Sequence, residues 1–383
     1  ASMTAAAPWP ISVRLYLASF VLVGLSVSVL GPSLTDLRER TGADIADIGI
    51  LFAGQSTGYI LGSFTGGRLY DRFNGHRVFA GALVVMAVGL TLVPVFAGLG
   101  GLLVTFFVLG CGASVADLGA NTLLMWELGP GSGRAMNLLH LCFGLGALAA
   151  PLVVYVGLGV GTRSAALVCL LLAVWASRVA APARAPVARD EHTDTTTGKL
   201  LSVAVFFMLC VGLEVGFAGW IKTYVEEIGF SALAATWLIT CFWIGFTSGR
   251  LLASALAHRL LPDVVLLLSS ILAVIAAIVM IVGGGNTVAV WVGTILMGLG
   301  SAPQFAGMMN LAERRIHISG SATAWFVGGA GTGGLVFPFV IGRWFGARGA
   351  TALPWAALGL ALATLLSFLA TDRALGRRAR SHR

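Results

Sequence analysis

Charged residues are scarce in this sequence: Asp, Glu, Lys and Arg make up 10% of its 383 residues, while 57% are hydrophobic. A soluble domain carries about 25% charged residues. The composition therefore excludes a soluble globular domain and indicates a chain that crosses a membrane many times. The apolar run from Ile11 to Leu30 is long enough to span, and it lacks the cleavage pattern of a secretory signal peptide.

Catalytic and metal-binding patterns are also missing. The sequence has no His or carboxylate set at metal-ligand spacing, no nucleophile elbow and no loop long enough for a soluble catalytic domain. Its five cysteines are odd in number and lie in apolar segments, so we interpret them as packing residues. We expect no enzyme activity, no metal site and no cofactor.

Apolar segments of spanning length follow one another along the chain and predict an all-α membrane protein. A polar stretch rich in Pro and Thr, residues 182–198, interrupts them and is typical of a linker. We predict a six-helix bundle over residues 1–181, a cytoplasmic linker over 182–198, a second six-helix bundle over 199–372 and a basic tail over 373–383. The twelve predicted transmembrane segments are 11–37, 46–67, 77–97, 101–127, 134–158, 163–181, 199–222, 232–257, 263–283, 287–311, 320–342 and 350–371.

The distribution of Lys and Arg predicts the orientation. With both termini cytoplasmic, only six of the 24 Lys and Arg residues fall on the outer side: Arg38, Arg40, Arg163, Lys222, Arg343 and Arg348. We therefore expect an inner (plasma) membrane protein. The net charge of +8 then reflects anchoring to anionic lipid, without nucleic acid as a partner. We expect a monomer.

Short glycine motifs recur in the two predicted bundles. Such repeats are typical of secondary transporters, whose halves rock about a site near the membrane midplane. The matching sets are Gly67-Arg68-Leu69 with Gly249-Arg250-Leu251, 182 residues apart; Gly144 and Gly146 with Gly331 and Gly333, 187 apart; and Gly110 and Gly112 with Gly298 and Gly300, 188 apart.

A carboxylate, Asp117, lies far from either end of the predicted fourth segment. An ionised Asp at that depth costs several kcal/mol unless it is paired, hydrated or protonated. Asn121 lies one turn further along, and Asn137 and His140 share a face of the next segment. We predict that Asp117 carries the coupling ion within a functional polar cluster, although a structural hydrogen-bond network would explain the same residues.

The second bundle offers another acid and a hydroxyl-and-indole stripe. Glu214 would join the ion pathway or accept hydrogen bonds from substrate hydroxyls. Thr240 and Trp243 share a helix face with Thr236 and Thr247, which suits the apolar faces and polar rim of a sugar. Alternatively, the Thr hydroxyls bond back to their own helix. Pro303, in the middle of a segment, predicts a bend.

Further polar and aromatic residues complete the predicted binding surface. Gln55 and Tyr59 share one helix face and serve either interhelical hydrogen bonds or a ligand. The predicted ion-coupling residues are Asp117 and Glu214. The predicted substrate contacts are Gln55, Tyr59, Asn121, Asn137, His140, Glu214, Thr240, Trp243, Gln304 and Trp325.

The loop after the second segment contains Gly67, Arg68, Asp71 and Arg72. It resembles the G-x-L-x-D-R-x-G-R-R signature of the major facilitator superfamily, with Asn74 inserted and His76 in place of an Arg. We interpret these four residues, with Arg250, as a gating charge clasp at the membrane edge. By contrast, the charges around Asp36 are most simply an outer interfacial cap.

The hairpin of the fourth and fifth segments resembles the fucose/galactose/glucose:proton symporters and the sodium-dependent glucose transporter-like proteins. The residues that carry the resemblance are Asp117, Asn121, Asn137-Leu138 and Phe143-Gly144-Leu145-Gly146-Ala147, with Glu214-Val215-Gly216, Trp220, Tyr224, Trp243 and Gly249-Arg250 in the second bundle. The resemblance implies a twelve-helix fold, a cavity lined by helices 1, 4, 7 and 10, and a helix 4 carboxylate that carries the proton. Asp117 stands where the family has Glu, and the family's acid in helix 1 has no match here.

We therefore expect a cation-coupled sugar symporter, with H+ as the first choice of ion and Na+ as the second, that works by alternating access. The expected substrate is a small polar molecule such as a monosaccharide. A drug/proton antiporter of the same fold is the alternative, and an intramembrane enzyme or receptor is a remote one.

Overall fold

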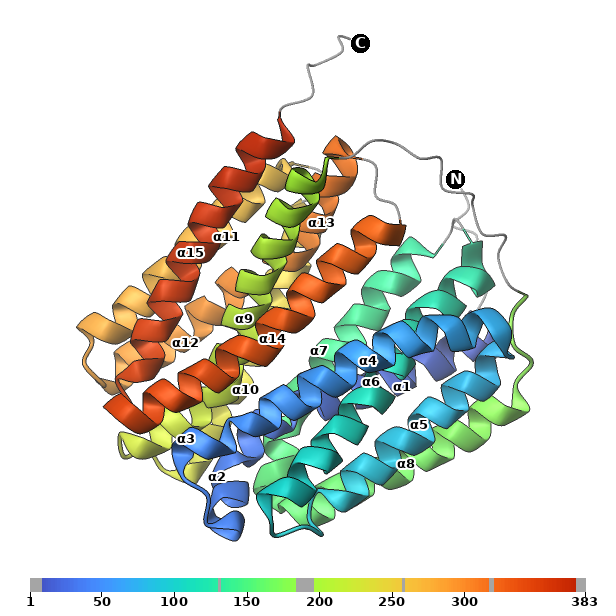
Figure 1. Cartoon of the computed structure of the whole chain (residues 1–383), viewed down its shortest axis with the longest axis horizontal. Coiled ribbons are helices and arrows are strands. Elements are labelled where there is room, and N and C mark those ends of the chain that lie inside the picture. Colours follow the sequence, from blue (N-terminus) through green and yellow to red (C-terminus); the bar gives the residue numbers. More distant parts are fainter. Residues whose placement is uncertain (1–8, 130–131, 184–195, 257–258, 317–319, 377–383) are drawn as a thin grey trace, which may run out of the picture.

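The computed structural model describes residues 9–129, 132–183, 196–256, 259–316 and 320–376, and every regular element in these ranges is a helix. Figure 1 shows the helices packed side by side, with α5 and α8 on one flank and α11 and α15 on the other. The helices are α1 (Ile11–Ser28), α2 (Leu30–Thr41), α3 (Ile45–Ile48), α4 (Ile50–Arg72), α5 (Gly75–Leu92), α6 (Leu99–Leu128), α7 (Gly133–Val156), α8 (Leu158–Arg178), α9 (Thr197–Glu227), α10 (Ala232–Leu256), α11 (Pro262–Val282), α12 (Thr287–Ser301), α13 (Gln304–Arg315), α14 (Gly320–Arg348) and α15 (Ala352–Leu375).

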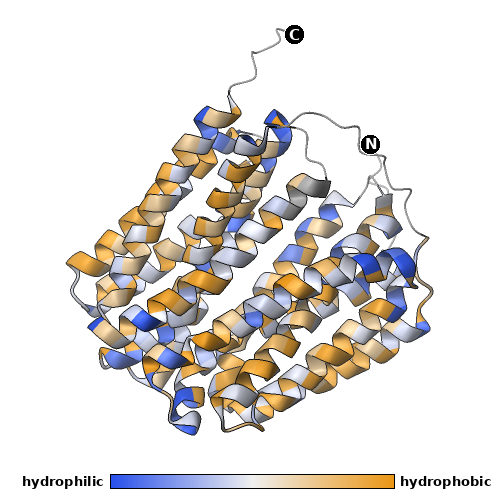
Figure 2. Cartoon of the chain, in the orientation of Figure 1, coloured by the Kyte–Doolittle hydropathy of each residue, from blue (hydrophilic) through white to orange (hydrophobic). Residues whose placement is uncertain are grey.

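Within the described ranges, eleven helices are long and apolar enough to cross a membrane, with α12 and α13 counted as one. Figure 2 shows apolar residues along most helices and hydrophilic residues gathered near their ends. The predicted segment 46–67 corresponds to α4, a helix of 23 residues that is not among the eleven. Gly, Gln, Ser, Thr and Tyr residues dilute the apolar content of α4.

Two predicted segments are broken in the structure. The predicted bend at Pro303 is confirmed, because α12 ends at Ser301 and α13 begins at Gln304. The first segment also breaks, at Val29 between α1 and α2. Pro32 has no N–H to bond the carbonyl of Ser28, four residues earlier, which explains this second break.

The outer limits of the predicted linker and tail differ slightly from the structure. Residues 184–195 of the predicted linker 182–198 lie outside the described residues, and α9 begins at Thr197. The predicted tail 373–383 begins within α15, and its residues 377–383 also lie outside the described part.

The repeat in the sequence is also a repeat in packing. In the first half of the chain, α1–α8, the close helix pairs include α1 with α7, α4 with α6 and α5 with α8; the second half, α9–α15, has the corresponding pairs α9 with α14, α10 with α12 and α11 with α15. Gly146 packs on the backbone of Val21, and Gly333 packs on the backbone of Met208. Both residues of the second pair lie 187 positions after their counterparts, so this offset relates these helices of the two halves. The corresponding residues of α6 and α12 lie 188 apart, since Gly110 packs on Gln55 and Gly298 packs on Phe242.

The halves meet along α4 with α14, α7 with α10, and α2 and α3 with α9 and α14. In Figure 1, α4 and α14 lie next to each other across the middle of the molecule. Gly144 of α7 packs on Thr247 of α10, and Gly331 of α14 packs on Ile60 of α4. These two contacts are again 187 residues apart, so the interface between the halves is itself nearly symmetric.

Candidate substrate and ion site

The carboxylate of Asp117 is held by two side chains of the first half. The Tyr59 hydroxyl of α4 donates to Oδ2, and Nδ2 of Asn121, one turn along α6, donates to Oδ1 at 2.8 Å. The same Asn121 nitrogen also donates to the Asp117 backbone carbonyl at 2.9 Å. The helical spacing of Asp117 and Asn121 explains their pairing, while Tyr59 is supplied by the close packing of α4 on α6.

The second half contributes Glu214 from α9 and Arg250 from α10. Both side chains are half-buried. Glu214 makes no hydrogen bond or ion pair with another residue in the described part of the chain. Arg250 interacts electrostatically with Glu214 and also with Asp117, across the interface between the halves. The site therefore contains two carboxylates and one guanidinium.

Asn137 and His140 of α7 are exposed, and neither hydrogen-bonds to Asp117 within the described residues. The His140 ring lies edge-on to Phe20, with 5.8 Å between ring centroids. It also interacts electrostatically with Arg250. The expected four-residue cluster therefore forms only in part: Asp117 and Asn121 are bonded, the two α7 residues are exposed, and only His140 of these two interacts with Arg250.

The hydroxyl-and-indole stripe of α10 has a mixed character. Thr236 donates to the carbonyl of Ala232 and Thr240 to that of Thr236, both at 2.8 Å. These two hydroxyls therefore bond back to their own helix, which was the alternative to substrate binding. By contrast, the buried indole N–H of Trp243 has no partner among the described residues. The hydroxyl of Thr247, in the same stripe, is likewise buried without a partner among the described residues. Unpartnered buried polar groups are costly, so Trp243 and Thr247 are the members of the stripe best suited to bond a ligand.

The other predicted substrate contacts differ in environment. Nε2 of Gln55 donates to the carbonyls of Ser26 (3.0 Å) and Val27 (3.3 Å), beside the break between α1 and α2. Gln304 is 1% exposed, and neither of its amide atoms has a partner among the described residues. Trp325 of α14 is 46% exposed. Substrate contact by Gln55, Gln304 and Trp325 stays a prediction. The two hydrogen bonds of Gln55 correspond to the other role considered for it, hydrogen bonding between helices.

A model of the Major Facilitator Superfamily matches residues 16–338. The chain belongs to this superfamily. Its relatives include sodium-dependent glucose transporter 1A of Mus musculus, 26% identical over 372 residues that cover 85% of this chain and 87% of the relative. The glucose/mannose transporter GlcP of Bacillus subtilis is 25% identical over 347 residues, 84% of each chain. The crystal structure of a mutant of the nucleoside transporter NupG has a TM-score of 0.76 at 16% identity, covers 96% of this chain and 100% of that one, and shows likeness of fold alone.

Membership of the Major Facilitator Superfamily agrees with the resemblance of the signature loop and makes this chain a membrane transporter rather than an enzyme. Arg68, Asp71 and Arg72 of that loop are exposed at the end of α4. Next to them, His76 is buried: its Nδ1 donates to the Val179 carbonyl at 2.8 Å, and its Nε2 accepts from the Tyr16 hydroxyl at 2.7 Å. His76 therefore fastens the start of α5 to α1 and to the end of α8.

Arg250 does not lie where the sequence repeat places it. The match between Gly67-Arg68 and Gly249-Arg250 at 182 residues is wrong as a structural equivalence, because the contacts of α4 and α10 repeat at 187. The counterpart of Arg250 is therefore Ser63, more than one turn inside α4 from Arg68. Arg250 is half-buried and interacts electrostatically with both carboxylates, while Arg68, Asp71 and Arg72 are exposed; a gating role for Arg250 stays a prediction.

Polar contacts between the two halves close the end of the molecule that carries α2 and α3, which we call the α2–α3 end. The sequence did not predict these contacts. Lys222 of α9, only 6% exposed, donates from Nζ to the Pro32 carbonyl at 2.8 Å. Glu226, 3.3 Å from Lys222, accepts a hydrogen bond from Thr35. Two exposed ion pairs also cross the interface, Arg38–Glu227 at 3.0 Å and Asp47–Arg343 at 2.9 Å.

Aromatic packing closes the same end. Trp220 of α9 is fully buried and donates from Nε1 to the Pro338 carbonyl at 2.8 Å. Its ring packs between Phe345 of the second half and Phe52 of the first, with centroid distances of 5.7 and 6.1 Å. The absent side chain of Gly49 leaves room for this indole.

Toward the opposite end the halves separate. Beyond the contact of Ile60 with Gly331, the side chains of Phe64 (48% exposed) and Trp325 (46%) are open. Beyond the contact of Gly144 with Thr247, His140 is exposed. Figure 1 shows α4 and α14 diverging toward the end where α14 begins. The structure is therefore closed at the α2–α3 end and more open at the other.

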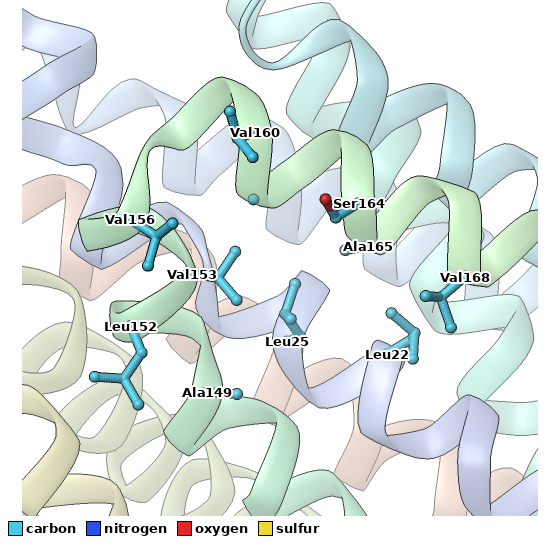
Figure 3. Close-up of a pocket in the computed structure, with 11 residues that line it drawn as sticks. Leu22, Leu25, Ala149, Leu152, Val153, Val156, Val160, Ser164, Ala165 and Val168 are labelled. Carbon is cyan, nitrogen blue, oxygen red and sulfur yellow. The ribbon is translucent and has the colours of Figure 1, made fainter.

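A separate apolar hollow of about 470 Å³ lies between α1, α7 and α8. Its wall includes Leu22, Leu25, Val153 and Val156, and Ser164 contributes the one hydroxyl among its lining residues (Figure 3). None of the predicted site residues lines it. The hollow therefore has no part in the polar site around Asp117.

Proposed function

We propose that this protein is a secondary active transporter that couples the uptake of a small sugar to the entry of a cation. Its fold would consist of twelve transmembrane helices, α4 included, in two six-helix bundles joined by the linker 182–198. It would act as a monomer in the inner (plasma) membrane, with both termini cytoplasmic. In that orientation the α2–α3 end faces outward, and the structure corresponds to an inward-facing state.

The observation that carries this proposal is the charge of the site. Among the residues that the structure describes, Arg250 is the one cation that interacts electrostatically with both Asp117 and Glu214. With both carboxylates ionised, the site carries one uncompensated negative charge, which is costly in a half-buried position. One bound cation removes it. A site with this balance favours a stoichiometry of one monovalent cation for each transport cycle.

We propose H+ as that cation and Asp117 as its carrier, with Na+ as the second choice. Tyr59 and Asn121 hold both oxygens of Asp117 in place. A proton on one oxygen leaves the other free to accept from Asn121, so the neutral carboxyl fits the same surroundings. Protonation would occur while the site faces outward and release while it faces inward.

The sugar assignment rests on the relatives and on the polar groups that still lack a partner. Two relatives are named glucose or glucose/mannose transporters. Glu214 can accept from substrate hydroxyls, and the indole N–H of Trp243 can donate to them. An indole beside polar groups also suits the apolar face of a sugar ring.

The test is uptake of D-glucose into proteoliposomes by Asp117→Asn, driven by a proton gradient or, separately, by a sodium gradient. If Asp117 carries the ion, uphill accumulation is lost while exchange of glucose across the membrane continues. Glu313→Gln, which alters an exposed carboxylate of α13, is the control and should accumulate glucose normally. Unchanged uphill uptake by Asp117→Asn would refute the assignment, and accumulation driven only by sodium would replace H+ by Na+.

A further inference from the structure

Arg250 stands where the pseudo-symmetry of the fold breaks. At the offset of 187, Phe246 of α10 corresponds to Tyr59 of α4, so the second half has a phenyl ring where the first has the hydroxyl that holds Asp117. The guanidinium of Arg250 lies over this ring, 4.6 Å from its centroid. In the second half, the ring that corresponds to Tyr59 therefore contacts a cation, Arg250, whereas in the first half Tyr59 itself contacts an acid, Asp117.

Three ionisable side chains from three helices interact with Arg250. They are Asp117 of α6, His140 of α7 and Glu214 of α9. The first two belong to the first half, and Glu214 belongs to the same half as Arg250. A movement of one half against the other must therefore change the distance of Arg250 from Asp117 more than its distance from Glu214.

Arg250 makes no hydrogen bond with any residue in the part of the chain that the structure describes. Its buried Nε has no partner, and the guanidinium forms no ion pair within 4.0 Å with any residue that the structure describes. A guanidinium has five N–H donors, and a carboxylate accepts about four hydrogen bonds. Asp117 and Glu214 both have acceptor capacity left, so a state in which Arg250 bonds one of them directly would satisfy these groups better.

We propose that Arg250 is a positioning residue that competes with the coupling cation for Asp117. This inference rests on the proposed function. With no cation bound, the guanidinium moves to Asp117 and pairs with it across the interface. A proton on Asp117 neutralises the carboxylate, and Arg250 then pairs with Glu214 in its own half. The empty carrier and the loaded carrier thus differ in whether a salt bridge joins the halves.

The first test needs no substrate. Thermal unfolding of Arg250→Gln in detergent is compared with the wild type across a range of pH. Without the guanidinium, the two carboxylates have no counter-ion, so the loss of melting temperature should grow as pH rises and both acids ionise, and vanish at low pH. Adding Glu214→Gln should recover most of the loss. A loss that is independent of pH, or that Glu214→Gln does not recover, would overturn the proposal.

The second test measures exchange of D-glucose in proteoliposomes. Arg250→Gln should slow exchange by at least about tenfold, because it leaves an uncompensated charge in the site. Arg163→Gln, which removes an exposed charge from α8, is the control. If the wild type exchanges no glucose, the sugar assignment fails while the melting data still decide the role of Arg250. Exchange by Arg250→Gln at the wild-type rate refutes the role of Arg250 alone.

Discussion

Replacing Lys222 by Met should open the α2–α3 end. The Lys222 ammonium is buried, and its bond of 2.8 Å to the Pro32 carbonyl joins the two halves. A hydrogen bond from a charged group contributes about 1.5–3 kcal/mol. The bond exists only while this end is closed, so its loss should lower the ratio of closed to open molecules by about tenfold to hundredfold. Glu226 also loses its neighbouring cation, which acts in the same direction.

Double electron–electron resonance measures this shift directly. Spin labels at Glu39 on α2 and Ser231 before α10, both exposed, report the separation of the halves at this end. The native cysteines are first replaced, and the labelled protein is studied in lipid nanodiscs without substrate. Lys222→Met should transfer intensity from the short distance of the closed state to a longer distance.

The neighbouring pair Arg38–Glu227 supplies a matched control. It also joins the halves, at 3.0 Å, but its side chains are 36% and 42% exposed. An exposed ion pair contributes about 0–1 kcal/mol, so Arg38→Gln should change the same ratio by less than about fivefold. The reasoning from burial is refuted if Lys222→Met leaves the distances unchanged or if Arg38→Gln opens this end equally well.

Two further predictions concern packing and stability. Gly144→Ala should slow initial glucose uptake, because the added methyl group meets the Thr247 hydroxyl at the interface of α7 and α10. Adding Thr247→Ala to the same chain should restore the rate of uptake. Equal rates in the single and double variants would contradict this prediction. His76→Ala leaves the Tyr16 hydroxyl and the Val179 carbonyl without their partner, at about 1–3 kcal/mol each, so the melting temperature in detergent should fall clearly, and an unchanged value would show that water replaces the imidazole.

Patterns local in sequence predicted much of the fold. Long apolar segments located the spanning helices, and Pro303 located the break between α12 and α13. Helical spacing also paired Asp117 with Asn121, because residues four apart lie on one face whatever surrounds the helix. Of the three offsets that the sequence offered, the glycine matches at 187 and 188 agree with the packing, since close helix packing requires a small residue at each position.

Contacts between distant helices could not be predicted in this way. Spacing places Gln55 and Tyr59 on one face but does not reveal that one bonds α1 and the other Asp117. Arg250 was misplaced because a short Gly-Arg-Leu motif recurs by coincidence five residues out of register with the true repeat. The charges near Arg38 were interpreted as an interfacial cap. Their pairing could not be predicted from the sequence, because Glu227, the partner of Arg38, lies 189 residues away.

The neighbours Tyr59 and Ile60 give α4 a particular mechanical importance. Tyr59 binds the Asp117 carboxylate, and Ile60 packs on Gly331 of the other half. Both residues belong to one uninterrupted helix, whose backbone also touches α6 at Gly58 and Gly62. A change in the hydrogen bond between Tyr59 and Asp117 therefore acts directly on this rigid helix. It does so one residue from the position where the helix contacts the other half, with no flexible segment between them to absorb the movement.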